Sequence, residues 1–165
     1  MATVARAAEI AKLEENVVPV PFKDSEYDRT SFLAKQAVKA TNQLGVKAIV
    51  TDSVTGRTAR TLAAFRSKVP VYAFCSKIET ARHLSVCYGV DPRFQEDTGY
   101  TTNKHKEYFL KALKSLEEKG SLTADDFVVY LSGTFTHGKG GLSFLEIEKV
   151  GNVLDAGDKY FVPVE

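Results

Sequence analysis

Cysteine, methionine and tryptophan are scarce in this chain of 165 residues, which contains two cysteines, one methionine and no tryptophan. Cys75 ends an apolar strand pattern, and Cys87 lies inside a helix pattern. Cysteines in such positions usually behave as small buried hydrophobic side chains. We therefore expect two free thiols rather than a disulfide, which is typical of a reducing cytosol.

Long apolar runs and an excess of one charge are also missing. No apolar stretch reaches the roughly 20 residues that a membrane-spanning helix needs. Arg6, Glu9 and Lys12 interrupt the N-terminal stretch, so it does not resemble a signal peptide. The net charge is +1, whereas general nucleic-acid binders are usually strongly basic. These features predict a cytoplasmic protein whose partners include neither a membrane nor a nucleic acid.

The residues that are present indicate one globular domain of alternating strands and helices. The chain is 44% hydrophobic and 26% charged, and its length suits a single core. Apolar periodicity predicts helices at 4–15, 28–44, 56–66, 76–89 and 103–119, and strands at 47–52, 69–74, from 90, 127–131 and 142–150. Residues 1–27 form an N-terminal helix and connector in this interpretation, residues 28–151 the core, and residues 152–165 a tail with a small edge strand at 160–164.

Local signals refine these predicted elements. Asp28 or Thr30 is expected to cap the second helix, and Ser76 with Glu79 forms a capping box for the fourth. Helical spacing predicts that the apolar face of the second helix consists of Phe32, Leu33, Ala37, Val38, Ala40, Thr41 and Leu44.

The last two predicted strands fix the fold class. They are joined by nine residues, 133–141, which is too short for a parallel crossover, so the fifth strand should run antiparallel to the fourth. Strand–helix repeats followed by one antiparallel edge strand predict an α/β protein, a three-layer α/β/α sandwich.

The sequence TDSVTGRT, residues 51–58, stands where the first strand passes into a helix. It supplies the hydroxyl groups of Thr51, Ser53, Thr55 and Thr58, a glycine at position 56 and the guanidinium of Arg57. Hydroxyls, backbone amides and the positive end of a helix dipole suit a phosphate monoester. The same serines and threonines could instead only cap the helix, and the chemistry leaves both interpretations open.

A second loop, GTFTHGKGG, joins the fourth and fifth strands. Its candidate ligand-binding residues are Gly133, Thr134, His137, Gly138, Lys139 and Gly140. Glycines allow a backbone to approach a ligand closely, although a hairpin tip that requires positive φ angles would also contain them. Both loops follow the carboxyl ends of parallel strands, where open α/β sheets bind ligands. If the first and fourth strands are neighbours, the two loops flank one crevice.

Signatures of catalysis and of metal binding are lacking. No cluster of histidine, cysteine and carboxylate residues has metal-ligand spacing, and the first loop lacks the ending of a P-loop. Asp52, Asp91 and Glu96 are candidate acid–base groups without an evident pair. We expect no catalytic residue, no metal and no resident cofactor.

Several motifs resemble the C-terminal α/β domain of pyruvate kinase. Residues 55–59 read TGRTA, residue 70 is a proline that opens a strand, residues 80–82 read TAR, and residues 89–92 read GVDP. The resemblance covers nearly all of residues 28–151. The stretch MATVARAAEIA is also similar to the last helix of the family's catalytic barrel, so the chain is either an excised domain or a free-standing relative.

The resemblance implies a mixed five-stranded sheet of order 3-2-1-4-5 with strand five antiparallel. It also implies a phosphorylated effector, often a sugar bisphosphate, with one phosphate in the loop 53–58 and the loop 133–141 closing over the sugar. Homo-oligomerisation, and a catalytic barrel on the same or another chain as a partner, are further implications. Because the barrel is not represented in this sequence, we do not expect the chain alone to transfer phosphate to ADP.

The sequence therefore leaves three hypotheses for the function. The first is a regulatory domain that binds a phosphate or sugar phosphate and takes part in oligomerisation. The second is a small stand-alone enzyme acting on a phosphorylated metabolite or cofactor, with His137, Lys139 and Asp52 as its candidate groups. The third is a structural assembly module that uses the fifth strand as an edge and binds no ligand.

Overall fold

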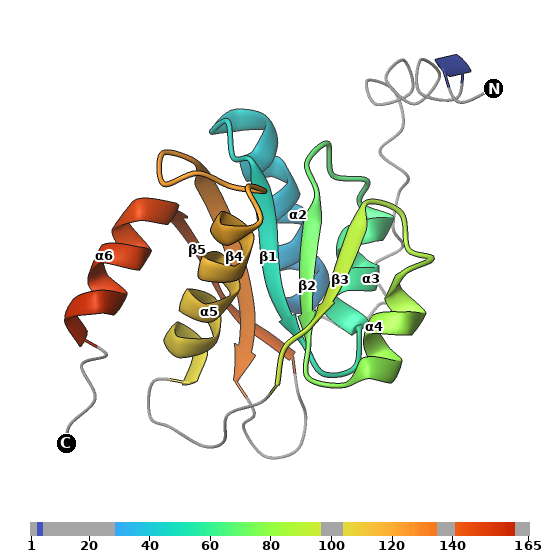
Figure 1. Cartoon of the computed structure of the whole chain (residues 1–165). Helices are drawn as coiled ribbons and strands as arrows, with labels where there is room; N and C mark the ends of the chain where they lie inside the picture. Colours follow the sequence, from blue (N-terminus) through green and yellow to red (C-terminus); the bar gives the residue numbers. More distant parts are fainter. Residues whose placement is uncertain (1–2, 5–28, 97–103, 135–140, 161–165) are drawn as a thin grey trace.

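Five strands and the helices on both their faces make up most of the described part of the chain (Figure 1). The structure is a computed structural model that describes residues 3–4, 29–96, 104–134 and 141–160. The elements follow one another as α2 (Arg29–Gln43), β1 (Ala48–Ser53), α3 (Arg57–Ala64), β2 (Val71–Cys75), α4 (Ile78–Leu84), β3 (Val90–Phe94), α5 (Lys104–Glu118), β4 (Phe127–Thr134), β5 (Gly141–Lys149) and α6 (Val150–Tyr160).

The strands form one mixed sheet in the order β3-β2-β1-β4-β5. β1 pairs in parallel with β2 on one side and with β4 on the other, and β3 continues the parallel part beside β2. β5 runs antiparallel to β4, as the short connection between them requires. The predicted strand order and the direction of the last strand are therefore confirmed.

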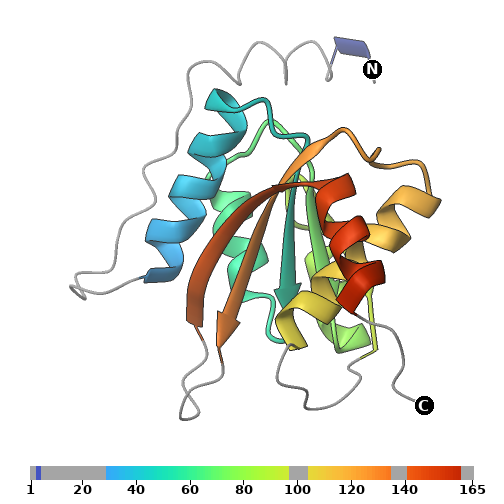
Figure 2. The same ribbon diagram turned by 90° about the vertical axis from the view of Figure 1, so that its left-hand side faces the viewer.

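Helices cover both faces of the sheet, so the predicted three layers are also confirmed (Figure 2). One face carries α2, α3 and α4, while α5 and α6 cover the other. The side chains of β1 alternate between these layers: Ala48 and Val50 pack toward α5, and Ile49 packs toward α2 and α3. Burial on both faces explains why β1 is a continuous apolar run and not an alternating one.

Aromatic packing fills the core on the α5 side. Tyr130 of β4 is 1% exposed, and its ring stacks on Phe109 of α5 with ring centroids 4.1 Å apart. Phe144 of β5 meets the Tyr130 ring edge-on at 5.7 Å. These contacts join α5 to the two strands at the antiparallel end of the sheet.

The two cysteines are free, as predicted. Cys75 is fully buried at the end of β2, and Cys87 packs against the same apolar cluster. Burial raises the pKa of the Cys75 thiol to about 11, so the thiol stays protonated and unreactive at neutral pH.

Some predictions about helix starts and ends were wrong. α2 already begins at Arg29, so Thr30 lies inside the helix and does not cap it, whereas the alternative cap, Asp28, lies outside the described residues. No side chain caps α4: Lys77 stands at its N-cap position, so Ser76 and Glu79 do not form the predicted capping box. α4 also ends at Leu84 rather than near Gly89.

The predicted apolar face of α2 was only partly correct. Ala37, Ala40 and Thr41 are buried as expected, but Phe32 and Leu44 are more than half exposed. Ala34 is buried in their place, together with the small polar residues Thr30 and Ser31. Small side chains let α2 approach the sheet closely, and a ranking by hydrophobicity overlooks them.

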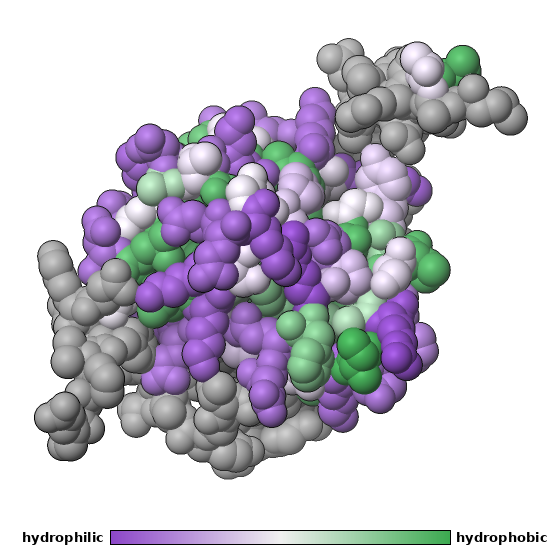
Figure 3. All heavy atoms as spheres, in the orientation of Figure 1, coloured by the Kyte–Doolittle hydropathy of each residue, from purple (hydrophilic) through white to green (hydrophobic). Residues whose placement is uncertain are grey.

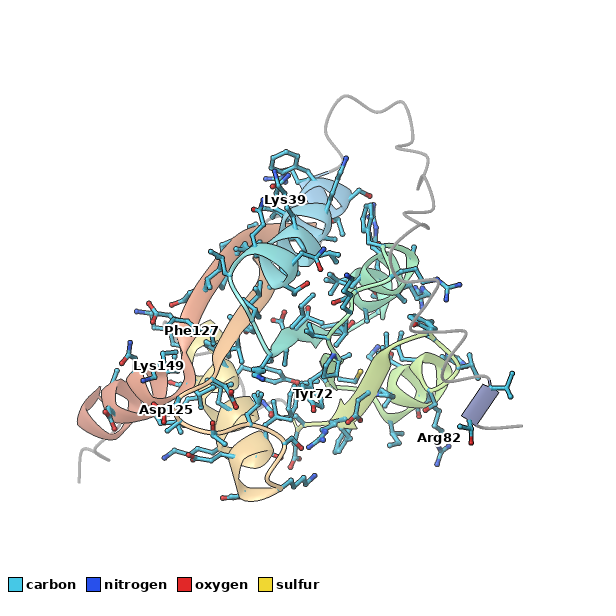
Figure 4. All side chains as sticks on the ribbon, turned by 90° about the horizontal axis from the view of Figure 1, so that it is seen from above. Lys39, Tyr72, Arg82, Asp125, Phe127 and Lys149 are labelled. Carbon is cyan, nitrogen blue, oxygen red and sulfur yellow. The ribbon has the colours of Figure 1, made fainter. Side chains whose placement is uncertain are left out.

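Helix α6, which residues 150–160 form, was not predicted from the sequence. Tyr160 belongs to this helix, and the rest of the edge strand predicted at 160–164 lies outside the described residues. Val150 is fully buried against the α5-side core, and Val153 and Leu154 pack on it. The backbone amides of Val150 and Gly151 donate to the carbonyls of Asp126 and Ala124, and Lys149 forms a 2.7 Å ion pair with Asp125 beside them (Figure 4). These contacts fix the turn from β5 into α6. The predicted helix at 4–15 and the connector after it lie almost wholly outside the described residues.

Candidate functional site

The candidate site lies where the order of the strands reverses. From β1 the chain proceeds outward to β2 and β3, whereas β4 returns to the opposite side of β1. β1 and β4 are parallel neighbours, with Thr51 opposite Leu131, so both strands end at the same edge of the sheet. The condition set by the sequence is therefore met: the loop after β1 and the loop after β4 leave adjacent strands at a topological switch point.

Gly56 shapes the loop between β1 and α3. Its φ of +77° is left-handed, and its amide donates a 3.0 Å hydrogen bond to the Oγ of Ser53. A Cβ atom at this position would lie 3.0 Å from Arg60 Nη1 and 3.3 Å from Leu84 Cδ2. Only glycine combines this backbone conformation with such close neighbours.

Contacts from two helices hold the same loop in place. The hydroxyl of Thr80 in α4 donates a 2.9 Å hydrogen bond to the carbonyl of Val54. Arg60 of α3 donates from Nη2 to the carbonyl of Thr55 at 3.1 Å. The sequence analysis missed both residues. The position of Arg60, one helical turn after Gly56, could have indicated it, but the contact of Thr80 spans 26 residues and has no local signal.

The start of α3 has the features that favour an anion. Gly56 stands at the N-cap position and has no side chain with which to form a capping hydrogen bond, and its own amide is bound by the Oγ of Ser53. Thr55 and Arg57 are exposed and Thr58 is half-buried, which places two hydroxyls and a guanidinium around this helix end. The helix dipole adds partial positive charge there.

The other two predicted hydroxyls serve the loop itself. Thr51 is fully buried in β1, and its hydroxyl donates to the carbonyl of Asp52 at 3.1 Å. Ser53 is 6% exposed and accepts the Gly56 amide. Both side chains therefore support the backbone beneath the surface that Thr55, Arg57 and Thr58 form.

The β4 side of the site is only partly described. β4 continues through Gly133 and Thr134, which were predicted to belong to the loop, because they pair with Leu142 and Gly141 of β5. A register shift after Ser132 marks the irregular end of this pairing. The other candidates on this side, His137, Gly138, Lys139 and Gly140, lie outside the described residues.

A side-chain hydrogen bond joins the two strand exits. The hydroxyl of Ser132 in β4 donates to Oδ2 of Asp52 in β1 at 2.8 Å. Ser132 is fully buried and Asp52 is half-buried. Burial raises the pKa of the nearby Tyr130 well above its usual range, and the negative charge of Asp52 raises it further. A carboxylate is thus fixed at the sheet edge between the two loops.

The described residues contain little that suits catalysis or metal binding. Among them, no group of three or more histidine, cysteine, aspartate or glutamate side chains could hold a metal ion. Asp91, a candidate acid–base group, forms a 3.0 Å ion pair with Arg93. None of the helices in the described part of the chain is long and apolar enough to span a bilayer.

Comparison with known proteins shows similarity to pyruvate kinases. The family model described as "Pyruvate kinase, alpha/beta domain" matches residues 31–148. A pyruvate kinase from Borreliella burgdorferi is 30% identical over 148 residues, covering 87% of this chain and 30% of that protein. Pyruvate kinase 2 from Synechocystis sp. is 28% identical over 159 residues, which is 93% of this chain and 26% of that protein.

A solved structure shows the same fold. The structure of Cryptosporidium parvum pyruvate kinase in complex with ADP superposes with a TM-score of 0.63 at 22% sequence identity, and the match covers 88% of this chain and 27% of that one. The chain thus spans less than a third of the length of each of these relatives.

Proposed function

This chain belongs to the family of the pyruvate kinase alpha/beta domain, and on that premise we propose that it is a regulatory domain that binds a phosphate or sugar phosphate at the loop 53–58. One observation carries the proposal. The loop leaves β1 at the switch point of the sheet and enters α3 at a helix end whose N-cap residue, Gly56, makes no side-chain cap hydrogen bond. Such helix ends bind phosphate groups through backbone amides and the helix dipole.

The residues of the loop have different roles in this proposal. Thr55 and Thr58 donate their hydroxyls to the phosphate oxygens, and Arg57 supplies charge. Thr51, Ser53 and Gly56 keep the loop in shape. Gly133, Thr134, His137, Gly138, Lys139 and Gly140 contribute the opposite wall, where the loop after β4 meets the ligand.

Replacing both Thr55 and Thr58 by alanine is expected to weaken the binding of fructose 1,6-bisphosphate and of inorganic phosphate. Hydrogen bonds to a charged oxygen contribute roughly 1–3 kcal/mol, so the dissociation constant should rise by about 5- to 150-fold. Isothermal titration calorimetry of the full chain measures this directly.

Thr61→Ala is the matched control for this experiment. Thr61 lies on the same helix, but its hydroxyl donates to the carbonyl of Arg57 at 3.0 Å, so it is engaged within α3. The control should bind like the unmodified chain. If no phosphate compound gives heat with the unmodified chain, or if the double variant binds as tightly as the control, the proposed site is wrong.

Two surfaces support the proposed association with partners. β5 ends the sheet, so one side of this nine-residue strand is an edge on which a second copy could add a strand. Hydrophobic side chains also lie exposed among hydrophilic ones over α4 and β3, namely Ile78, Val86, Tyr88 and Phe94 (Figure 3). We assign the β5 edge to homo-oligomerisation and the α4–β3 surface to a catalytic barrel on the same or another chain.

Light scattering at micromolar concentration should show a species larger than the 18.1-kDa chain. A monomer at that concentration would contradict the role of the β5 edge. Size-exclusion chromatography of this chain mixed with the barrel of a relative tests the second surface, where separate elution would count against it.

A further inference from the structure

We infer that Pro92 closes the β3 edge of the sheet to strand addition, so that copies of this chain can join their sheets only through β5. The part that concerns β5 rests on the oligomerisation proposed above. The described sheet ends at β3 on one side and at β5 on the other. An edge strand presents unpaired amides and carbonyls on which another chain can add a strand. The two edges of this sheet differ in the number of such groups.

Hydrogen bonds at both ends of β3 show which of its residues face β2. The amide of Val71 donates to the carbonyl of Gly89 at 2.9 Å, and the amide of Gln95 donates to the carbonyl of Cys75 at 3.0 Å. On the β3 side, both bonds involve odd-numbered residues, and the backbone groups of a strand alternate between its two sides. The even-numbered residues of β3 therefore direct their backbone groups away from the sheet. They are Val90, Pro92 and Phe94.

Only one of these outward-facing residues has an amide available to a partner. The amide of Val90 donates to the carbonyl of Cys87 at 3.3 Å, within the turn before the strand. Pro92 has no amide hydrogen, which is why proline inside a sheet is found on edge strands. Phe94 remains as the last residue of the strand. A partner strand needs donors and acceptors at every second residue, so one amide at the end of β3 cannot hold it.

β5 offers a longer row of outward-facing groups. The amide of Val150 donates to the carbonyl of Asp126 at 2.9 Å, directly across the end of the antiparallel pair. Hydrogen-bonded and non-hydrogen-bonded pairs alternate from this point, so the residues of β5 that face away from β4 are Leu145, Ile147 and Lys149. The register of β4 and β5 is regular over all three. β5 therefore has the repeated donors and acceptors that β3 lacks.

This difference decides what an assembly through the sheet can become. Two β5 strands can pair antiparallel about a two-fold axis, and the assembly then closes at two copies. Pairing of β5 with β3 of the next copy would instead be head-to-tail, and it would continue into a fibre. Because Pro92 leaves β3 without a row of donors, the head-to-tail arrangement is excluded.

Closing the β3 edge also protects an apolar surface. The Phe94 side chain is 54% exposed at the end of β3, and Val86 and Tyr88 are exposed between α4 and β3. An open edge with exposed apolar side chains is a typical site of aggregation. Asp91 and Arg93, which form a 3.0 Å ion pair, add charge to the same strand. The partner proposed for the α4–β3 surface must therefore bind through side chains and not by adding a strand.

Pro92→Val tests the inference, because it supplies the missing amide and a strand-forming side chain. Light scattering should give the unmodified, fully associated chain about twice the 18.1-kDa mass of one copy. At the same concentration, Pro92→Val should have about twice that mass or more, and its mass should rise with concentration. Hydrogen exchange at residues 90–94 should slow as the concentration of Pro92→Val rises, and should stay constant in the unmodified chain.

Pro70→Val is the matched control. Pro70 precedes β2, an inner strand, and its carbonyl accepts the amide of Ile49 at 3.0 Å, so a new amide there does not lie on a sheet edge. This variant should have the mass of the unmodified chain. Pro92→Ala adds the same amide with a weaker strand former, so it should associate like Pro92→Val but at higher concentration. Urea denaturation shows whether each variant is folded.

The outcomes separate the two parts of the inference. Equal masses of the unmodified chain and both Pro92 variants would show that the proline does not close the edge, and would overturn the inference. Growth of Pro70→Val to the same extent as Pro92→Val would do so too, because it would assign the effect to the loss of any proline. A monomeric unmodified chain would overturn the part that concerns β5, together with the proposed oligomerisation. The comparison of the two valine variants would then still decide the part that concerns β3.

Discussion

Tyr130→Ala should lower the free energy of unfolding by about 3–5 kcal/mol, which is the usual cost of removing a large buried aromatic side chain. Tyr130 is 1% exposed, stacks on Phe109 with an interplanar angle of 3° and meets Phe144 edge-on. Its ring thus joins α5, β4 and β5, and no neighbour can fill the space without moving one of them. Urea denaturation followed by circular dichroism measures the loss.

Tyr130→Phe is the control that keeps the ring. It removes the hydroxyl, which is hydrogen-bonded to Ser132, and should cost about 1 kcal/mol. If alanine and phenylalanine at this position cost the same, the aromatic contacts contribute little and the core on the α5 side is held together elsewhere.

The arrangement of the sheet was predictable because its signals are local and repeated. Ala48, Ile49 and Val50 read as a strand covered on both faces, and their burial bears this out. The nine-residue connection at 133–141 excluded a parallel crossover, so the direction of β5 followed from its length alone. A short connection allows very few relative directions for the two strands that it joins, so the sheet topology could be predicted.

The wrong predictions concern features that tertiary packing decides. Phe32 has a strong hydrophobic signal but lies on the exposed side of α2, because alanines provide the close contact with the sheet. Asn152, Gly157 and the charges of residues 150–160 obscured helix α6, whose side chains seen to pack on the core, among those described, are Val150, Val153 and Leu154. Gly157 itself is buried, and an added Cβ there would meet Leu110 of α5, so close packing of the two helices requires this weak helix former.

In the candidate site, too, features with a local sequence signal could be predicted, and features that depend on tertiary contacts could not. The loop 51–58 could be located because hydroxyls, a glycine and a strand-to-helix change coincide within a few residues. Its anchors could not be found, because Thr80 reaches Val54 from another helix and Ser132 reaches Asp52 across 80 residues of sequence. The position of the loop at the switch point could therefore be predicted from the sequence. The hydrogen bonds that hold the loop in place could be found only in the three-dimensional structure.

Gly56→Ala is expected to destabilise the chain by about 2–3 kcal/mol and to abolish binding at the loop. A non-glycine residue at a φ of +77° costs roughly 1–2 kcal/mol. The new Cβ would also press on the guanidinium of Arg60 at 3.0 Å and on Leu84 at 3.3 Å. Because Arg60 holds the carbonyl of Thr55, its displacement would move the residues proposed to contact the phosphate.

Gly120→Ala separates the two contributions. Gly120 has a similar φ of +66°, but a Cβ added there has nothing within 4 Å. This variant should show the cost of backbone strain alone, roughly 1–2 kcal/mol, and should bind phosphate like the unmodified chain. The difference in unfolding free energy between the two variants then measures the crowding of Gly56 by Arg60 and Leu84. Equal stability losses, with binding kept in both, would mean that the loop can adjust to a side chain at position 56 and that its close packing is not needed for the site.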